Sequence, residues 1–187
     1  MLELNNHRFN HLKIHTQYSI CEGAIKIDNL KDFCKENKIP CLGLSDTSNL
    51  CGALEFAENI SKVGTQPIIG TQINFKFEDT TGLLPLIALN EKGYKRIIEL
   101  SSMSYLKNDA LSDPHLDLKE LLNNIEGVLL LSGTIHGLFG RLFQKGHFEQ
   151  ISKLYKNLSS KFQNKFYLEI QRHGDENEIA FEQFNLE

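Results

Sequence analysis

Short apolar runs and amphipathic segments alternate along this chain, and the alternation predicts a β-α-β fold. Apolar runs bounded by turn residues predict strands, and apolar residues at helical spacing predict helices. The predicted strands cover residues 8–15, 40–45, 67–73, 83–89, 127–132 and 166–171. The predicted helices cover residues 28–37, 50–63, 91–106, 117–124, 138–145 and 148–162. This alternation favours a parallel sheet, either open or closed into a barrel.

Individual residues predict where some of these elements begin and end. Gly64 is the expected C-cap of the second helix, and Asp117 the expected N-cap of the fourth. Thr81-Gly82 predicts a turn between two strands. The sequence ends in a helical pattern after the strand at 166–171, and a barrel would need at least one more strand to close. We therefore expect an incomplete part of a longer protein.

Composition limits the function classes. The length of 187 residues suits one domain over residues 1–187, and 41% hydrophobic residues suffice for a core. The net charge of −4 argues against a domain that grips a phosphate backbone over its whole surface. No apolar run is as long as a membrane span, and the first residues lack a signal-peptide pattern. Four cysteines without CxxC spacing favour reduced thiols and a cytoplasmic location.

Polar side chains gather at the ends of two predicted strands. His11, Lys13 and His15 alternate along the first strand, so they are expected on one face of it. Asp46 follows a short apolar run typical of a buried parallel strand. Polar residues at the carboxyl ends of such strands usually form a site. The sequence therefore predicts a site where these two strands end.

Histidines and a carboxylate on neighbouring strand ends are typical of metal sites. The candidate ligands are His11, His15, Asp46 and His173, with His136 more distant. The alternative is a set of hydrogen-bonded polar residues without a metal, and spacing alone favours this alternative. The dinucleotide and P-loop fingerprints are absent from the sequence, and no G-x-S-x-G motif occurs.

Six segments carry a resemblance to a known family: FNHLKIHTQYS (9–19), LGLSDTSNLCGALEF (42–56), QPIIGTQINF (66–75), IALNEKGYKRIIELSSMSYL (87–106), IEGVLLLSGTIHG (125–137) and FYLEIQRHG (166–174). In this order they resemble the PHP (polymerase and histidinol phosphatase) domain. More closely, they are similar to the PHP domain that begins the alpha subunit of bacterial DNA polymerase III. The resemblance implies a distorted seven-stranded (β/α) barrel, incomplete in this fragment. Intact members hold up to three zinc or manganese ions.

Four positions depart from the ligand pattern of intact members. The first motif of the family ends in His-x-His, and its first histidine is Lys13 here. The second motif is Asp-His, and its histidine is Thr47 here. The acidic residue expected after Ile69-Gly70 is Gln72, and the cysteine expected after Ser132-Gly133 is Thr134. The resemblance therefore implies that several metal ligands have been lost.

Only His15, Asp46 and His173 stand where intact members have ligands, and His11 matches a motif position without counting as a ligand. A protonated lysine cannot ligate a metal, and its charge repels one. Lys13 is therefore expected to replace the charge of the metal and to pair with Asp46. So few ligands should bind a divalent ion poorly, which indicates a vestigial metal site retained as structure.

The resemblance implies a parent protein that acts in DNA replication as a DNA-directed DNA polymerase, a nucleotidyltransferase that uses magnesium. Its polymerase carboxylates would lie beyond residue 187, so no catalytic residue is assigned here and the fragment alone is expected to be inactive. No cofactor is expected in the fragment, unless the site is partly functional and binds zinc or manganese. Its expected role is a structural scaffold.

The resemblance also implies partners: the remainder of the alpha subunit, a separate proofreading exonuclease subunit that docks on the domain, and primer-template DNA through the parent protein. No membrane partner is expected. A different class of function stays open, namely an active metal-dependent phosphoesterase or 3′–5′ exonuclease. A third is a small-substrate phosphatase of the histidinol phosphate type. The number of intact ligands discriminates between scaffold and enzyme.

Overall fold

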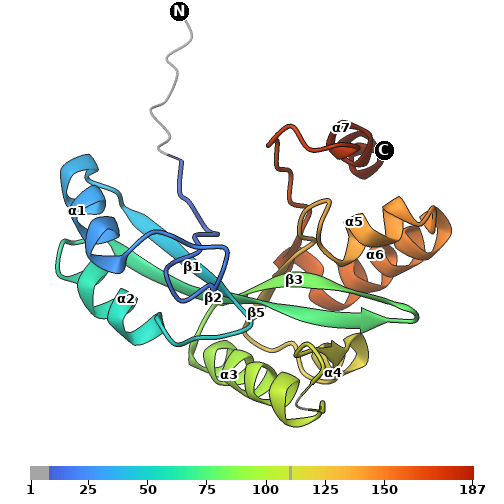
Figure 1. The fold of residues 1–187 in the computed structure, drawn as a ribbon, viewed down its shortest axis with the longest axis horizontal. Coiled ribbons are helices and arrows are strands. Elements are labelled where there is room, and N and C mark those ends of the chain that lie inside the picture. Colours follow the sequence, from blue (N-terminus) through green and yellow to red (C-terminus); the bar gives the residue numbers. More distant parts are fainter. Residues whose placement is uncertain (1–8, 110) are drawn as a thin grey trace, which may run out of the picture.

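The computed structural model describes residues 9–109 and 111–187 as one sheet with helices around it (Figure 1). The strands are β1 (Cys41–Thr47), β2 (Gln66–Phe77), β3 (Thr80–Ala88), β4 (Leu116–Asp117), β5 (Val128–Leu131) and β6 (Phe166–Tyr167). The helices are α1 (Ile27–Asn37), α2 (Ala53–Ser61), α3 (Glu91–Leu106), α4 (Leu118–Asn123), α5 (Leu138–Gln144), α6 (Phe148–Phe162) and α7 (Glu178–Leu186). The predicted mixture of strands and helices is confirmed.

The sheet is mixed and open, with the strand order β1-β2-β3-β5-β6 and with β4 paired to β2. The β1–β2, β2–β4 and β5–β6 pairs are parallel, whereas β2–β3 and β3–β5 are antiparallel. The prediction of a parallel sheet is therefore wrong for two pairs. The physical reason is clear for β2 and β3, because Glu78 and Asp79 alone connect them and a parallel crossover needs about a dozen residues or more.

The turn between β2 and β3 also lies earlier than predicted. Glu78 takes a positive φ of 52° in this turn, whereas Thr81 and Gly82 belong to β3. Gly82 marks a close approach instead of a turn, because a Cβ there would lie 2.5 Å from the Cα of Leu138. The glycine thus lets the start of α5 pack directly on the strand.

The first segment, residues 9–16, follows β1 without forming the regular strand predicted for 8–15; residue 8 lies outside the described residues. An isolated parallel bridge joins Ile14 to Leu44. Gly43 permits this contact, because a Cβ at that position would lie 2.4 Å from the carbonyl oxygen of Leu12. The predicted strand at 166–171 is likewise reduced to the two residues of β6.

One predicted helix boundary and one predicted capping contact are corrected. Helix α2 ends at Ser61 with Lys62 as its C-cap, and Gly64 takes its positive φ of 80° two residues later. Asp117 occupies the N-cap position of α4, but its side chain makes no capping hydrogen bond. It forms an ion pair with Lys119 instead, with 3.1 Å between the charged atoms. The capping prediction was right about position and wrong about the contact.

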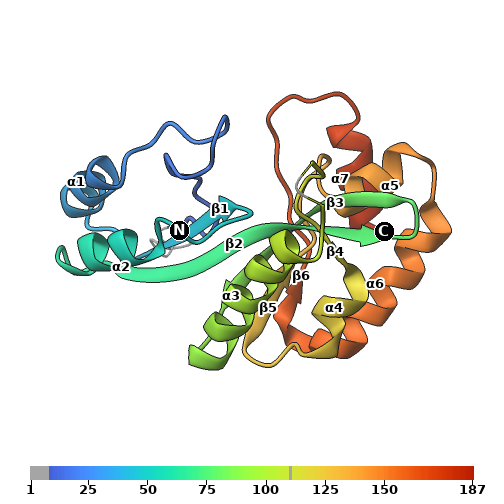
Figure 2. The ribbon, with the colours of Figure 1, turned by 60° about the horizontal axis from the view of Figure 1, so that its bottom comes forward.

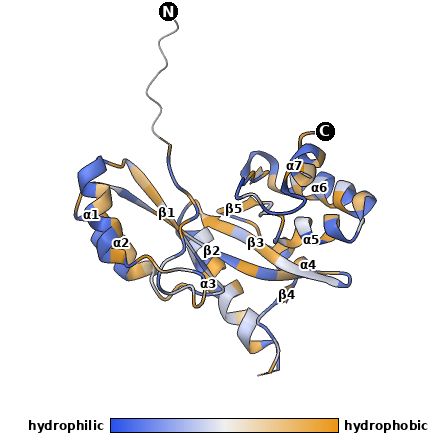
Figure 3. Cartoon of the chain, turned by 45° about the horizontal axis from the view of Figure 1, so that its top comes forward, coloured by the Kyte–Doolittle hydropathy of each residue, from blue (hydrophilic) through white to orange (hydrophobic). Residues whose placement is uncertain are grey.

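Two hydrophobic clusters form the core. Figure 2 shows the elements that build them, with β1, α1 and α2 at one end of β2 and the other helices around the rest of the sheet. The smaller cluster packs β1 against α1 and α2 through buried residues such as Leu44 and Phe56. The larger cluster lies among β2, β3, β5 and helices α3 to α7, around Phe75 and Phe139. In Figure 3, β1 and β3 carry hydrophobic colour while much of α1 is hydrophilic. Strand β2 therefore connects two separate cores.

Within the described ranges, no helix has both the length and the apolar character that crossing a bilayer requires.

Candidate functional site

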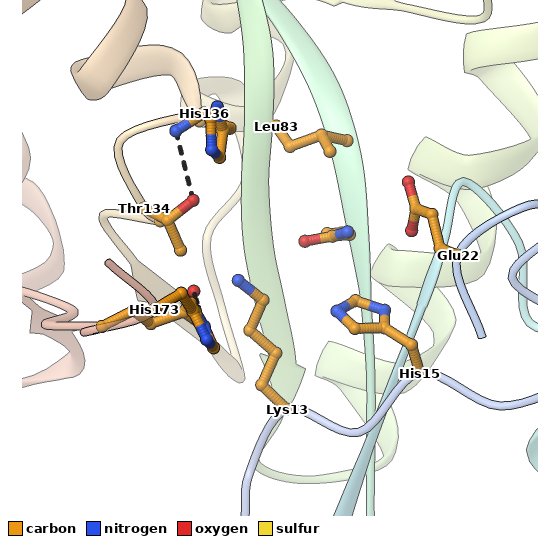
Figure 4. Close-up of a pocket in the computed structure, with 11 residues that line it drawn as sticks. Lys13, His15, Glu22, Leu83, Thr134, His136 and His173 are labelled. Atoms are coloured by element: carbon orange, nitrogen blue, oxygen red, sulfur yellow. Dashed lines mark hydrogen bonds between the residues drawn. The ribbon is translucent and has the colours of Figure 1, made fainter. Parts of the chain in front are cut away.

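A cavity of about 400 Å³ opens between the first segment and the residues that follow β6, and we call it the cleft. Figure 4 shows the Lys13 side chain pointing into it between His15 and His173. Its lining residues are Lys13, His15, Glu22, Gln72, Leu83, Gly133, Thr134, His136, Gly137, Gln171 and His173. Six of the residues singled out from the sequence thus meet in one place: Lys13, His15, Gln72, Thr134, His136 and His173.

Asp46 lies beside the cleft, fully buried, with its carboxylate oxygens already engaged. Oδ1 accepts hydrogen bonds from the Thr16 backbone N–H at 2.6 Å and from the Ser19 hydroxyl at 2.7 Å. Oδ2 accepts one from the Thr16 hydroxyl at 2.8 Å. The carboxylate therefore holds the chain at residues 16–19 against the end of β1.

His11 does not join the cleft, so the expectation that it shares a face with Lys13 and His15 is wrong. Its side chain is exposed and lies edge-on to the Phe9 ring, with 4.9 Å between ring centroids. The physical reason is the backbone, because side chains alternate between two faces only along a regular strand. The first segment has isolated bridges and no regular strand.

Lys13 pairs with Glu169, not with Asp46 as predicted. Its ammonium lies 3.0 Å from Glu169 Oε1, and the two side chains are only 15% and 12% exposed. The same oxygen accepts a hydrogen bond from Gln171 at 2.7 Å, and the Glu169 backbone N–H donates to the Ser132 hydroxyl. The pair joins positions 156 residues apart. Lys13 thus ties the first segment to the chain that follows β6.

Thr47 and Gln72, two positions at which the resemblance implies lost ligands, bond to each other. The β1–β2 register places them opposite one another, and the Gln72 amide donates to the Thr47 hydroxyl at 2.7 Å. That hydroxyl donates in turn to the Glu22 carboxylate. The sequence reasoning missed both Glu22 and Glu169. The sequence did hold a signal for both, because Glu169 lies within the matched motif 166–174 and Glu22 follows the matched motif 9–19.

Among the cleft histidines, His15 has the protonation state and the unpaired ring nitrogen that a metal ligand needs. Burial lowers the pKa of His15, and the neighbouring Lys13 ammonium lowers it further. The ring is therefore neutral at neutral pH, as a metal ligand must be. Its Nδ1 atom is buried and has no hydrogen-bond partner among the described residues. This atom alone, however, does not make a metal centre.

The other cleft histidines are exposed and bound to side chains. His173 Nε2 lies 3.2 Å from Gln171 Oε1. His136 Nε2 lies 3.0 Å from an Asp175 carboxylate oxygen, and its backbone N–H donates to the Thr134 hydroxyl. Both rings thus face polar partners on the rim of the cleft.

The side chains present do not fit a zinc or manganese centre. Across residues 9–109 and 111–187, no three His, Cys, Asp or Glu side chains are grouped so that they could hold a metal ion. Asp46 is committed to Thr16 and Ser19, and the Lys13 ammonium occupies the cleft beside His15. An ammonium in this place opposes a second cation.

The fold and the cleft define an α/β protein whose polar side chains converge where strands end. Residues 11–173 match the PHP domain family, and the chain belongs to this family.

The chain is similar to DNA polymerase III alpha subunits. It is 35% identical to that of Caulobacter vibrioides over 97% of this chain and 17% of the relative. The identity is 36% with Rickettsia conorii, covering 94% of this chain and 15% of the relative. The identity is 32% with the alpha subunit of Vibrio cholerae, covering 98% of this chain and 16% of the relative. The chain thus spans less than a fifth of the length of these relatives.

Two solved structures resemble part of the fold. One is described as a metal-dependent phosphoesterase from Bifidobacterium adolescentis, with a TM-score of 0.42 and 16% identity. The other is an amidohydrolase from Chromobacterium violaceum, with a TM-score of 0.43 and 15% identity. Each likeness covers 52% of this chain and 33% of the other chain.

Proposed function

We propose that this chain is the N-terminal PHP domain of a replicative DNA polymerase III alpha subunit and serves there as a structural scaffold with a degenerate metal site. The similarity to alpha subunits over nearly the whole chain supports the first part. In the parent protein, further strands would complete a seven-stranded barrel of PHP type around the open sheet. The domain would reach primer-template DNA through the rest of the alpha subunit, in the cytoplasm.

One observation carries the scaffold role: apart from His15, the positions that resemble ligand positions are bonded within the protein. Gln72, Thr47 and Glu22 form a hydrogen-bonded series, and Lys13 pairs with Glu169. We assign His15, Asp46 and His173 as vestigial ligand positions and Lys13 as the charge that replaces a metal. Polar side chains that satisfy one another stabilise a fold, whereas a metal centre needs them free to coordinate.

In this proposal polymerisation belongs to other parts of the parent protein, which would use magnesium for nucleotidyl transfer. This chain supplies no catalytic carboxylate to that reaction. Its contribution is to hold the neighbouring parts of the alpha subunit and to present a surface for the proofreading subunit.

Zinc or manganese should neither stabilise this chain nor elicit 3′–5′ exonuclease activity. A ligand that binds only the native state raises the melting temperature, so the absence of a shift at stoichiometric zinc reports the absence of a strong site. The measurements are thermal melts with and without zinc, and nuclease assays with manganese or zinc on single-stranded DNA.

The matched control is the combined variant Lys13→His, Thr47→His, Gln72→Glu and Thr134→Cys, which restores the ligand types of intact members. Zinc should raise its melting temperature. A wild-type chain that melts higher with zinc, or a nuclease activity that Asp46→Asn abolishes, would establish the phosphoesterase or exonuclease alternative instead.

The cognate proofreading exonuclease subunit should co-purify with this chain, because the proposal makes the domain its dock. An unrelated exonuclease of similar size and charge is the control and should not be retained. If the cognate exonuclease subunit is not retained at low salt, the docking role is wrong. The scaffold role is tested separately, by the zinc and manganese experiments.

Duplex DNA should bind weakly and with a steep dependence on salt, since the chain carries a net charge of −4.

A further inference from the structure

A small, partly open cavity of about 10 Å³ lies between the residues that follow β6 and helix α7. Its polar lining residues include Thr134, Glu169, Gln171, Glu178 and Asn185. A volume of roughly 10–15 Å³ is what a single water molecule needs inside a protein. The cavity is thus large enough for one water and too small for a larger ligand.

Two buried polar atoms of this lining have no hydrogen-bond partner in the described residues: Glu169 Oε2 and Asn185 Nδ2. The other carboxylate oxygen of Glu169 is bonded to Lys13 and Gln171. Asn185 Oδ1 accepts a hydrogen bond from the Tyr155 hydroxyl at 2.8 Å, which leaves Nδ2 as the unpaired donor of this amide. The two residues thus line the same cavity, and each has one unpaired polar atom, an acceptor in Glu169 and a donor in Asn185.

We propose that one buried water molecule occupies this cavity and bridges the two atoms. It donates a hydrogen bond to Glu169 Oε2 and accepts one from Asn185 Nδ2. A water molecule can do both, whereas a cation could not accept from the amide N–H group. Buried polar groups are rarely left unpaired, so the two atoms and the fitting volume point to the same occupant.

The water extends the polar contacts of the cleft to the C-terminal helices. Lys13 of the first segment bonds to Glu169, the water joins Glu169 to Asn185 of α7, and Asn185 bonds to Tyr155 of α6. Figure 1 shows α7 beside α5 and α6, on the side of the molecule opposite α1 and α2. Asn185 is thus a positioning residue for the Lys13–Glu169 pair. This inference does not depend on the proposed function.

A high-resolution crystal structure of the full chain tests the water directly. The expected result is a single density peak about 2.7–3.2 Å from both Glu169 Oε2 and Asn185 Nδ2. In Asn185→Leu the peak should be lost while the rest of the cleft is retained. A cavity without density, a peak coordinated as a cation, or direct contact between the two side chains would each overturn the proposal.

A double-mutant cycle between Lys13→Met and Asn185→Leu tests the connection in solution. The two side chains make no direct contact in any hydrogen bond or ion pair described above, so additive effects are expected unless the water couples them. With the water, the combined effect on the unfolding equilibrium constant should differ from the product of the single effects by roughly twofold or more. Asn157→Leu, at an exposed position on α6, is the matched control and should combine with Lys13→Met multiplicatively. A multiplicative result for Asn185→Leu would overturn the coupling.

Discussion

Replacing Asp46 with alanine should destabilise the chain by about 3–5 kcal/mol, since each buried donor left without an acceptor costs about 1–3 kcal/mol. Three donors lose their acceptor in this variant: the Thr16 backbone N–H, the Thr16 hydroxyl and the Ser19 hydroxyl. The hydroxyl groups can rotate toward other acceptors, so the total stays below the sum of three full penalties. Urea-induced unfolding, followed by circular dichroism, measures the loss.

Asp46→Asn separates the hydrogen bonds from the charge. The asparagine Oδ1 can still accept from Thr16 and Ser19, and we expect a smaller loss of about 1–2 kcal/mol. Glu58→Ala, at an exposed position on α2, is the control and should change stability by no more than about 0.5 kcal/mol. An Asp46→Ala variant as stable as the wild type would show that the carboxylate does not hold residues 16–19.

Replacing Lys13 with methionine should cost about 3–5 kcal/mol, the usual cost of removing one partner from a buried ion pair. Glu169 would keep its charge in a largely buried place, with Gln171 as its remaining side-chain donor. The double variant Lys13→Met/Glu169→Leu should recover much of this loss, because well-packed apolar side chains often replace a buried pair without penalty. Chemical denaturation of the wild type, the single variants Lys13→Met and Glu169→Leu, and the double variant gives the interaction energy.

The exposed pair Lys153–Glu149 on α6 provides the matched control for this cycle, with side chains 79% and 89% exposed. Its interaction energy should be at most about 0.5 kcal/mol, because water and salt screen such pairs. If the Lys13–Glu169 cycle gives an energy as small as the control, Lys13 does not substitute for a metal charge in the sense proposed.

The sheet shows which parts of a fold a single sequence can predict. The apolar runs placed β1, β2 and β3 within a few residues, because burial of a strand depends on its own side chains. Strand direction was partly readable, since only the nine residues 74–82 separate the predicted strands 67–73 and 83–89. Such a connection is too short for a parallel crossover and indicates a hairpin. The β3–β5 connection is long enough for either direction, so its antiparallel pairing was not readable.

The sequence predicted which residues line the cleft better than it predicted which residues they contact. Lys13, His15, Gln72, Thr134 and His173 do line one cavity, as matched motifs suggested. The partner of Lys13 depends on how segments at opposite ends of the chain pack. The predicted pairing of the first segment with β1 places Asp46 near Lys13. It carries no information about Glu169, which is 156 positions from Lys13 in the sequence.

The contact between the first segment and β1 bears on how such a site can change over evolutionary time. Backbone groups make this contact: the Ile14 N–H donates to the Gly43 carbonyl, and the Ser45 N–H donates to the Ile14 carbonyl. These bonds are indifferent to which side chains stand at positions 13 and 15. A ligand at either position can therefore be exchanged by mutation without dislodging the main chain that carries it. A lineage could therefore lose a metal one residue at a time while the architecture stayed intact, whereas a side chain at position 43 would clash with the Leu12 backbone.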